Sequence, residues 1–384
     1  MWGDRRAPVL AGMLAVGLFL AACQSGGGDA AVGGDGQDIG PDEAAFSHAG
    51  PYDVGVRTLQ LDDDHKTEVF YPAAAGATNG KSEVVYDMTY ALGDSLAGMV
   101  PETLKMPYEV PAFRDVRAAA KGKFPVVVYS HGYGGWRTIN ATMLANIASW
   151  GFIVASTDKP DQRFEAVFLN VARPDWDPDV DAVLMSATLD RIIDEGKDGG
   201  ILAGAVDAGH VAAMGHNSGG GDSYSMVRND DRVDVGISWN YTFSEDVGNK
   251  PFMIIAADGD PVTPRVDADF AKLTGPSRLV QLANSGHMVP TDICDGLLSP
   301  DGLLSRLDKS NFRLPPVIDD VIRNGCEPGD LAVPKGQAVY LHFTIAELRD
   351  AFGIGKEGAG LGQEVVADLP ALVVYTQTHI ADDG

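Results

Sequence analysis

Short apolar runs rich in β-branched residues alternate along this chain with longer stretches of helical periodicity. The clearest run is FPVVVY at residues 124–129, and its unbroken apolar character is typical of a strand buried on both faces. This alternation predicts an α/β fold with a mostly parallel central sheet and helices on both faces. We expect strands at residues 66–71, 124–129, 152–156, 211–214, 233–239, 251–257 and 278–282, and helices at residues 138–150, 179–195 and 337–352.

The loop after residues 124–129 has the sequence SHGYGG at residues 130–135. In a parallel sheet, ligands bind at loops that follow the carboxyl ends of the strands. Glycines in such a loop let backbone N–H groups approach a ligand closely. The pattern resembles the H-G-x-G-type loop that supplies one oxyanion-hole N–H, and Tyr133 would be that donor. A glycine-rich turn without a ligand is the alternative.

The loop after residues 211–214 has the sequence GHNSGGG at residues 215–221. It resembles the G-x-S-x-G nucleophile elbow, a strained turn in which bulky residues two positions from the nucleophile would clash. Gly215 and Gly219 match the two small positions, so Asn217 stands where the nucleophilic Ser is expected. Ser218 follows one position later, where the second oxyanion-hole N–H is expected.

Two further loops carry a candidate acid and a candidate base. Residues 258–264, DGDPVTP, follow the run 251–257, and a carboxylate there would orient a catalytic His. We prefer Asp260, because Asp-x-x-x-Pro resembles the usual acid loop, and Asp258 is the alternative. His287 follows the run 278–282 and is the candidate base. The order of nucleophile, acid and His along the chain is that of α/β-hydrolases.

Several segments resemble the family of platelet-activating-factor acetylhydrolases and their bacterial relatives, with the cutinase-like polyester hydrolases as the neighbouring family. They are GPYDVG at residues 50–55, FYP at 70–72, the loop–helix–strand unit at 126–161, and 207–216 before the elbow. The resemblance implies an α/β-hydrolase fold and a serine-esterase mechanism without a metal or organic cofactor. It implies carboxylic esters with short acyl chains, or phospholipid-like esters, as substrates.

The same resemblance implies roles for the site residues. His287 would be the base and Asp260 the residue that orients it, while the backbone N–H groups of Tyr133 and Ser218 would bind the oxyanion. The departure from the family pattern is Asn217, because an amide is a very poor nucleophile and cannot form an acyl-enzyme as a hydroxyl does.

Three interpretations of this departure follow from the residues. Ser218 could serve as the nucleophile through a one-residue shift of the elbow, which the flexible Gly219-Gly220-Gly221 would permit and the bulky His216 would oppose. Alternatively, the chain is a non-catalytic relative that binds an ester, a lipid or a partner. In the third interpretation Asn217 hydrolyses to Asp and supplies a carboxylate nucleophile.

The N-terminus has the pattern of a secretory signal. Arg5 and Arg6 precede an apolar run at residues 7–20, which is too short to span a bilayer, where about 20 residues are needed. The run ends in Leu-Ala-Ala-Cys23, which resembles the bacterial lipoprotein signal, in which the chain is cut before the Cys and the thiol is lipidated. We therefore expect a signal peptide at residues 1–22 and an exported protein held on a membrane by the Cys23 lipid. An ordinary signal with a chance Cys is the alternative.

Residues 23–50 are rich in Gly, Asp and Ala and lack apolar periodicity, so we expect a flexible tether there. Residues 51–384 have the composition of one globular domain. Because the exported compartment is oxidising, we expect Cys294 and Cys326 to form a disulfide, with two buried free thiols as the alternative.

The charge balance excludes one class of partner. The chain has 29 Lys and Arg against 54 Asp and Glu, a formal net charge of −25, and no cluster of basic residues. Binding to nucleic acid requires such a cluster, so we expect no nucleic-acid partner. No set of His residues has metal-ligand spacing, and the sequence carries no indication of the oligomeric state.

Overall fold

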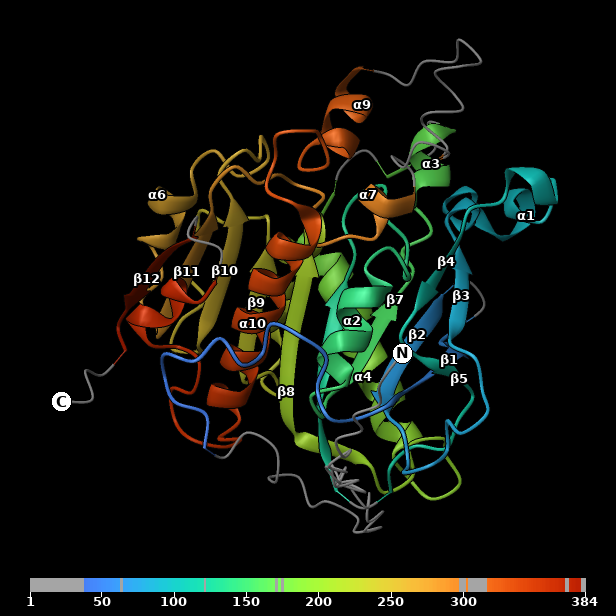
Figure 1. Ribbon diagram of the computed structural model, residues 1–384, viewed down its shortest axis with the longest axis horizontal. Coiled ribbons are helices and arrows are strands. Elements are labelled where there is room, and N and C mark those ends of the chain that lie inside the picture. Colours follow the sequence, from blue (N-terminus) through green and yellow to red (C-terminus); the bar gives the residue numbers. More distant parts are fainter. Residues whose placement is uncertain are drawn as a thin grey trace, which may run out of the picture.

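The computed structural model describes residues 38–62, 65–120, 122–169, 172–173, 176–296, 302, 316–369 and 373–380. Its centre is a 10-stranded sheet with the order β12-β11-β10-β9-β8-β6-β7-β2-β1-β5, and β3 and β4 form a separate pair (Figure 1). The strands are β1 Val54–Gln60, β2 Lys66–Pro72, β3 Val84–Asp87, β4 Pro107–Val110, β5 Phe113–Arg114, β6 Phe124–Ser130, β7 Ile153–Thr157, β8 Val206–His216, β9 Val235–Trp239, β10 Phe252–Ala257, β11 Ser277–Leu282 and β12 Val373–Thr378.

The middle of the sheet is parallel. Strands β7, β6, β8, β9, β10 and β11 pair in parallel, whereas β2 joins β7, β1 joins β2, and β12 joins β11 in antiparallel fashion. The carboxyl ends of the six parallel strands therefore lie together at one end of the sheet, the upper end in Figure 1. The loops that the sequence singles out all begin at this end.

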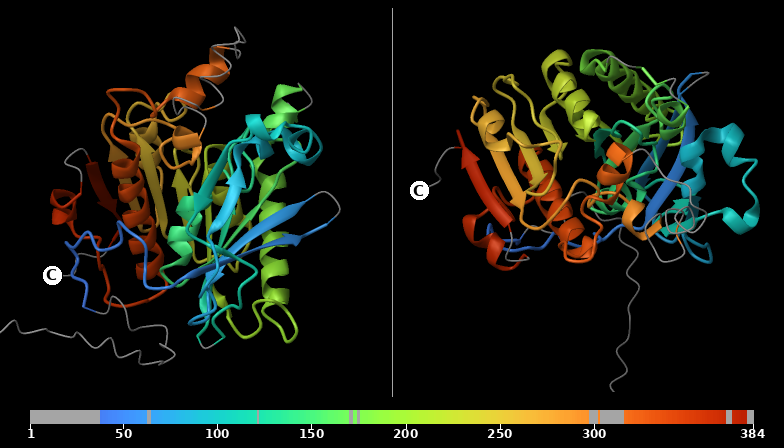
Figure 2. Two further views of the ribbon diagram at one scale, coloured as in Figure 1. Left: turned by 45° about the vertical axis from the view of Figure 1, so that its right-hand side comes forward. Right: turned by 90° about the horizontal axis from the view of Figure 1, so that it is seen from above.

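Helices cover both faces of the sheet (Figure 2). Helices α2 and α10 pack on one face, and α4 and α5 pack on the other. The helices are α1 Gly93–Ala97, α2 Ala141–Ala148, α3 Phe164–Phe168, α4 Pro178–Glu195, α5 Ser218–Asn229, α6 Val266–Phe270, α7 Ile293–Gly296, α9 Pro316–Arg323 and α10 Val333–Ala351, with short 3-10 helices η1 Met88–Leu92, η2 Glu102–Leu104 and η3 Gln363–Ala367.

Strand β6 shows why the central runs are continuously apolar. Val127 and Tyr129 contribute to the core under α2 and α10, while Val126 and Val128 contribute to the core under α4 and α5. All seven residues of β6 are buried. A strand with helices on both faces has no solvent-facing side, so alternation with polar residues disappears.

The α/β fold that the sequence predicts is confirmed, and each expected strand and helix overlaps an element of the structure. The elements that were not predicted lie mostly at the sheet edges, namely β1, β5 and β12, or in the β3–β4 insertion. Edge strands such as β12, with the sequence VVYTQT, have a neighbouring strand on one side only and keep polar residues. The apolar pattern that predicts a strand is therefore weaker in their sequences.

The folded part of the chain begins before residue 51, the start that the sequence predicts. Phe46, which the sequence analysis assigns to the tether, is fully buried in the core, and its backbone N–H donates to Nδ1 of His342 on α10 at 3.2 Å. A Cβ added to Gly50 would lie 2.4 Å from the carbonyl oxygen of Ser149. Residues 38–50 therefore pack on the domain. The sequence did not reveal this, because a single aromatic anchor in a Gly- and Asp-rich segment is a weak signal. The predicted signal peptide and Cys23 lie outside the described residues.

Within the part of the chain that the structure describes, no helix combines the length and the apolar character needed to cross a membrane.

Candidate active site

Asn217 occupies a strained turn between β8 and α5. Its backbone angles are φ 55° and ψ −131°, a conformation that non-glycine residues rarely adopt. The turn is held by two backbone hydrogen bonds, from the N–H of Asn217 to the carbonyl of Trp239 at 3.0 Å and from the N–H of Gly220 to the carbonyl of Asn217 at 2.8 Å. A strained residue that its surroundings fix in this way is a common feature of functional sites.

The flanking glycines fix which residue is at the centre of the turn. A Cβ on Gly215 would lie 2.0 Å from the carbonyl oxygen of Gly219, and a Cβ on Gly219 would lie 2.0 Å from the carbonyl oxygen of Ser130. Both positions therefore exclude any side chain. Since these glycines lie two positions before and two positions after Asn217, the elbow is centred on Asn217 and not on Ser218.

The carboxamide of Asn217 bridges two groups of the site. Its Nδ2 lies 2.9 Å from Nε2 of His287, and its Oδ1 accepts a hydrogen bond from the backbone N–H of Tyr133 at 3.2 Å. An amide nitrogen only donates, so Nε2 of His287 accepts and the ring carries its proton on Nδ1. The side chain thus contacts the candidate base and the candidate oxyanion donor at the same time.

His287 is in turn oriented by Asp260. Nδ1 of His287 lies 2.9 Å from Oδ2 of Asp260, and both side chains are almost completely buried. The other carboxylate oxygen of Asp260 accepts from the N–H of Val262 at 2.8 Å. Asp258, the alternative acid, is exposed and accepts from the backbone N–H of Ser285 at 3.3 Å. The geometry therefore pairs His287 with Asp260 and not with Asp258.

Ser218 is the first residue of α5, and its side chain does not reach the base. The residue is buried, and its hydroxyl has no hydrogen-bond partner among the described residues. Its backbone N–H has no acceptor within the helix, because the first N–H groups of a helix are unpaired. The position suits an oxyanion donor, while the hydroxyl lies apart from the chain of contacts that joins Asn217, His287 and Asp260.

Two further polar residues hold the His287 loop, and the sequence analysis did not identify their roles. The backbone carbonyl of His287 accepts from Nδ2 of Asn240 at 2.9 Å and lies 2.9 Å from Nε2 of His216. Burial lowers the pKa of His216 well below its usual value, so its ring stays neutral. Asn240 directly follows β9, and a polar residue at a strand's carboxyl end was the available signal.

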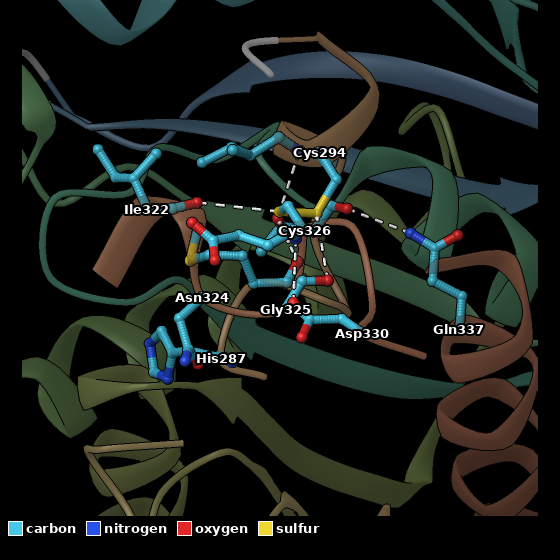
Figure 3. The surroundings of a disulfide bond; sticks show 12 residues. His287, Cys294, Ile322, Asn324, Gly325, Cys326, Asp330 and Gln337 are labelled. Atoms are coloured by element: carbon cyan, nitrogen blue, oxygen red, sulfur yellow. Dashed lines mark hydrogen bonds between the residues drawn. A yellow bond between two sulfur atoms is a disulfide. The ribbon is translucent and has the colours of Figure 1, made fainter. Parts of the chain in front are cut away.

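A disulfide lies near this loop (Figure 3). Cys294 and Cys326 are bonded, which confirms the predicted pair. Asn324, two residues before Cys326, accepts from the backbone N–H of His287 at 2.5 Å and donates from Nδ2 to the carbonyl of Gly259 at 3.0 Å. One side chain therefore bridges the base loop and the acid loop, next to a covalent link.

The oxyanion loop is tied to α5 by a buried ionic cluster. Asp222 on α5 accepts from the hydroxyl of Ser130 at 2.7 Å and from the ammonium of Lys159 at 2.6 Å. Burial, opposed in part by Lys159, raises the pKa of Asp222 to about 6. His131 in the same loop is fully buried, and this burial lowers its pKa to about 4. These contacts fix the loop that presents the N–H of Tyr133.

The described residues contain no group of three or more His, Cys, Asp or Glu side chains that could hold a metal ion. The chemistry available at the elbow is that of the Asn217 amide, the His287–Asp260 pair and two backbone N–H groups.

Comparisons with known proteins find hydrolases that are similar in sequence. The family model described as platelet-activating factor acetylhydrolase, isoform II, matches residues 42–173. The platelet-activating factor acetylhydrolase of Cavia porcellus is 24% identical over 249 residues, which are 52% of this chain and 57% of the relative. A bis(hydroxyethyl) terephthalate hydrolase of Streptomyces coelicolor is 24% identical over 156 residues, 38% of this chain and 43% of the relative. The matched part thus spans about half the length of these relatives.

A solved structure extends the likeness to nearly the whole fold. A ferulic acid esterase from Streptomyces cinnamoneus superposes with a TM-score of 0.62 at 20% identity and covers 88% of this chain and 99% of the esterase. At this identity the superposition shows the fold. The chain therefore has an α/β-hydrolase fold and is similar in sequence to platelet-activating factor acetylhydrolases and to a bis(hydroxyethyl) terephthalate hydrolase.

Proposed function

We propose that the elbow is the ester site of a carboxylic-ester hydrolase, and that the encoded chain binds esters there without a hydroxyl nucleophile. The observation that carries this proposal is the position of the Asn217 carboxamide between His287 Nε2 and the Tyr133 N–H. In a serine esterase these two groups would act on the nucleophile and on the substrate carbonyl, respectively.

The geometry favours this form of the proposal over Ser218 as a shifted nucleophile. The hydroxyl of Ser218 is buried without a partner, whereas Asn217 contacts the base directly. An amide at the attacking position cannot form an acyl-enzyme. An ester would bind with its carbonyl oxygen at the N–H groups of Tyr133 and Ser218, in competition with Oδ1 of Asn217.

A second candidate function is slow ester hydrolysis by the encoded chain. The intact pair of His287 and Asp260 supports it, since such a pair can activate a water molecule. Without a covalent nucleophile, a serine-protease site retains only about 10³–10⁴-fold acceleration over water. A weak activity that disappears in His287→Gln would identify this candidate.

We propose short-chain or phospholipid-like carboxylic esters as ligands. The names of the relatives include an acetylhydrolase, a terephthalate-ester hydrolase and a ferulic acid esterase. Exposed apolar side chains also lie in the oxyanion loop, in the insertion between β3 and β4 and after α3, which suits a ligand with apolar groups. They are Leu96, Met99, Leu104, Tyr133 and Leu169.

We further propose that the protein is an exported bacterial lipoprotein anchored through Cys23. The support is the charged start, the short apolar run and the small residues before Cys23. Incorporation of labelled fatty acid into the chain, and its loss in Cys23→Ser, would test the anchor. An equal incorporation into both chains would contradict it.

The ester site is tested by hydrolysis of p-nitrophenyl acetate. We expect the encoded chain and Ser218→Ala to be equally slow, and Asn217→Ser to gain at least about 10³-fold in kcat, because the hydroxyl then sits against His287. His287→Gln combined with Asn217→Ser should remove the gain. A fast encoded chain that is inactivated by Ser218→Ala would overturn the proposal in favour of the shifted nucleophile.

A further inference from the structure

The elbow geometry points to a self-modification of this protein. We infer that Asn217 is converted to Asp within the folded chain, by attack of the Ser218 backbone nitrogen on the Asn217 side-chain carbonyl and release of ammonia. This inference goes beyond the proposed ester site and does not depend on it, because no substrate takes part.

The backbone of Asn217 is held in a conformation suited to ring closure. The ψ angle is −131°. Viewed along the Cα–C bond of an L-residue, Cβ lies a third of a turn from the backbone nitrogen of the same residue. The ψ angle of Asn217 therefore brings its Cβ close to eclipsing the backbone nitrogen of Ser218. A five-membered succinimide ring needs that arrangement. An ordinary helix or strand lies in other regions of φ and ψ and lacks it.

The attacking nitrogen and the reacting carbonyl are both prepared. Ser218 begins α5, so its N–H is not used in a helical hydrogen bond. The carbonyl Oδ1 of Asn217 accepts the N–H of Tyr133 at 3.2 Å. This hydrogen bond stabilises the negative charge that develops on Oδ1 when Cγ becomes tetrahedral.

The leaving group is also in contact with a proton carrier. Nδ2 of Asn217 lies 2.9 Å from Nε2 of His287, whose other nitrogen is held by the buried Asp260. Ammonia leaves an amide only when its nitrogen gains a proton. Nε2 of His287 carries no proton at the start, so it can take up the proton released from Ser218 N and pass it to Nδ2. The chemical groups that would cleave a bound ester therefore surround a side-chain amide of the protein itself.

The conversion balances in two steps. In the first, the bond from Ser218 N to Asn217 Cγ forms and the bond from Cγ to Nδ2 breaks. Nε2 of His287 takes up the proton that Ser218 N gives up and passes it to Nδ2, so ammonia leaves and the imidazole ring returns to its starting state. In the second step water attacks the succinimide and opens the ring. The net reaction is Asn plus water to Asp plus ammonia.

The site should also decide which product forms. Opening of the ring at Cγ restores the normal peptide bond and gives Asp, whereas opening at the main-chain carbonyl gives isoaspartate. The N–H of Tyr133 polarises the carbonyl at Cγ. We therefore expect Asp to predominate over isoaspartate, and the new carboxylate would be a nucleophile of the type that forms covalent esters, placed against His287.

The chain supplies a matched internal control. Asn284-Ser285 repeats the dipeptide Asn217-Ser218, and Asn284 also has a positive φ of 51°. It is exposed, however, and within the described part of the chain no hydrogen bond joins it to His287. Trypsin releases Asn217 within residues 198–228, where it is the sole amide side chain. Both sites can therefore be followed by mass spectrometry in one digest.

The experiment is incubation of the freshly purified full chain near neutral pH in water enriched in oxygen-18. We expect Asn217 to become Asp with one heavy oxygen at least tenfold faster than Asn284, with Asp as the main product. In urea the two sites should react at similar rates. His287→Gln and the milder Asp260→Asn should both slow the reaction at Asn217 and leave Asn284 unchanged.

Three results would overturn the inference. They are an Asn217 that stays intact in the folded chain, an Asn217 that reacts no faster than Asn284, and isoaspartate as the main product. A rate at Asn217 that is unchanged in both variants, with folding verified by circular dichroism, would also overturn it. None of these results depends on ester hydrolysis by Asn217→Ser, so failure of this inference and failure of the proposed function are distinguishable.

Discussion

A single side chain determines the chemistry that this site can perform. A Ser at the elbow would contact His287 and leave the N–H of Tyr133 free for a substrate carbonyl. The carboxamide of Asn217 is longer and has both a donor and an acceptor, so it contacts both groups at once. Under the proposed function, an ester carbonyl has to displace Oδ1 of Asn217, so we expect the encoded chain to bind esters more weakly than the Asn217→Ser variant.

The distinction between the two candidate acids can be measured at the residue scale. In the Asn217→Ser background, Asp260→Asn should lower kcat by about 10⁴-fold, because the amide would hold His287 in the wrong tautomer. Asp258→Asn is the matched control and should change kcat little, since Asp258 is exposed and its carboxylate accepts from the backbone N–H of Ser285. Nitrophenyl acetate kinetics check both variants. A comparable loss in Asp258→Asn would refute the assignment.

At the scale of elements, the sequence predicts the centre of the sheet well and its periphery poorly. Strand β6 is recognisable because helices on both faces force it to be apolar throughout. The β3–β4 insertion is not recognisable, because its apolar residues pack on loops. Met88 and Met106 join a separate cluster with Trp136 and Met288, next to the oxyanion and base loops. Such contacts between distant loops have no periodic signal.

The contact between the acid and base loops yields a prediction about Asn324. In the Asn217→Ser background, Asn324→Ala should lower kcat by about 10²-fold and leave KM nearly unchanged, because a small misplacement of His287 slows the reaction without altering ester binding. Asn229→Ala is the control, since Asn229 bonds to Asp179 and Ser225 on the helices α4 and α5. A loss carried mainly by KM would contradict a positioning role.

The disulfide gives a prediction for the stability of the same region. Cys294 and Cys326 are separated by 32 residues in sequence, so the link should stabilise the fold by about 4 kcal/mol through restriction of the unfolded chain. The double variant Cys294→Ser/Cys326→Ser should therefore unfold at lower urea, with a similar dependence on urea concentration. Equal unfolding midpoints would show that the link contributes no stability.

At the scale of the whole molecule, the order of the loops could be predicted and the register of the elbow could not. The parallel strands bring Tyr133, Asn217, Asp260 and His287 to one edge because the carboxyl ends of parallel strands meet there. The choice between Asn217 and Ser218 depends on clashes at Gly215 and Gly219, which involve atoms of other loops. The buried anchor Phe46 was missed for a similar reason, since its partners are Trp150 just after α2 and His342 on α10.

The anchored N-terminal segment makes the stability of the whole molecule depend on pH. Burial lowers the pKa of His342 from 6.5 to about 4 in the folded chain, where the neutral ring accepts the N–H of Phe46 and contacts the carbonyl of Gly360. Between these two pKa values the unfolded chain binds the extra proton. Stability is therefore retained above about pH 6.5 and lost as the pH falls toward about 4.

His342→Gln tests this dependence, because a Gln amide can accept from Phe46 and donate to Gly360 without titrating. Urea unfolding at pH 7 and pH 5 should show that the encoded chain loses about 2 kcal/mol more than the variant over this interval. Other acid-sensitive groups, such as the buried His131 with a pKa of about 4, are present in both chains, so their contributions cancel in the difference. An equal loss of stability in both chains would contradict this prediction. It would mean that other contacts offset the cost of protonating His342 in the folded molecule, and that the packing of Phe46 does not depend on pH.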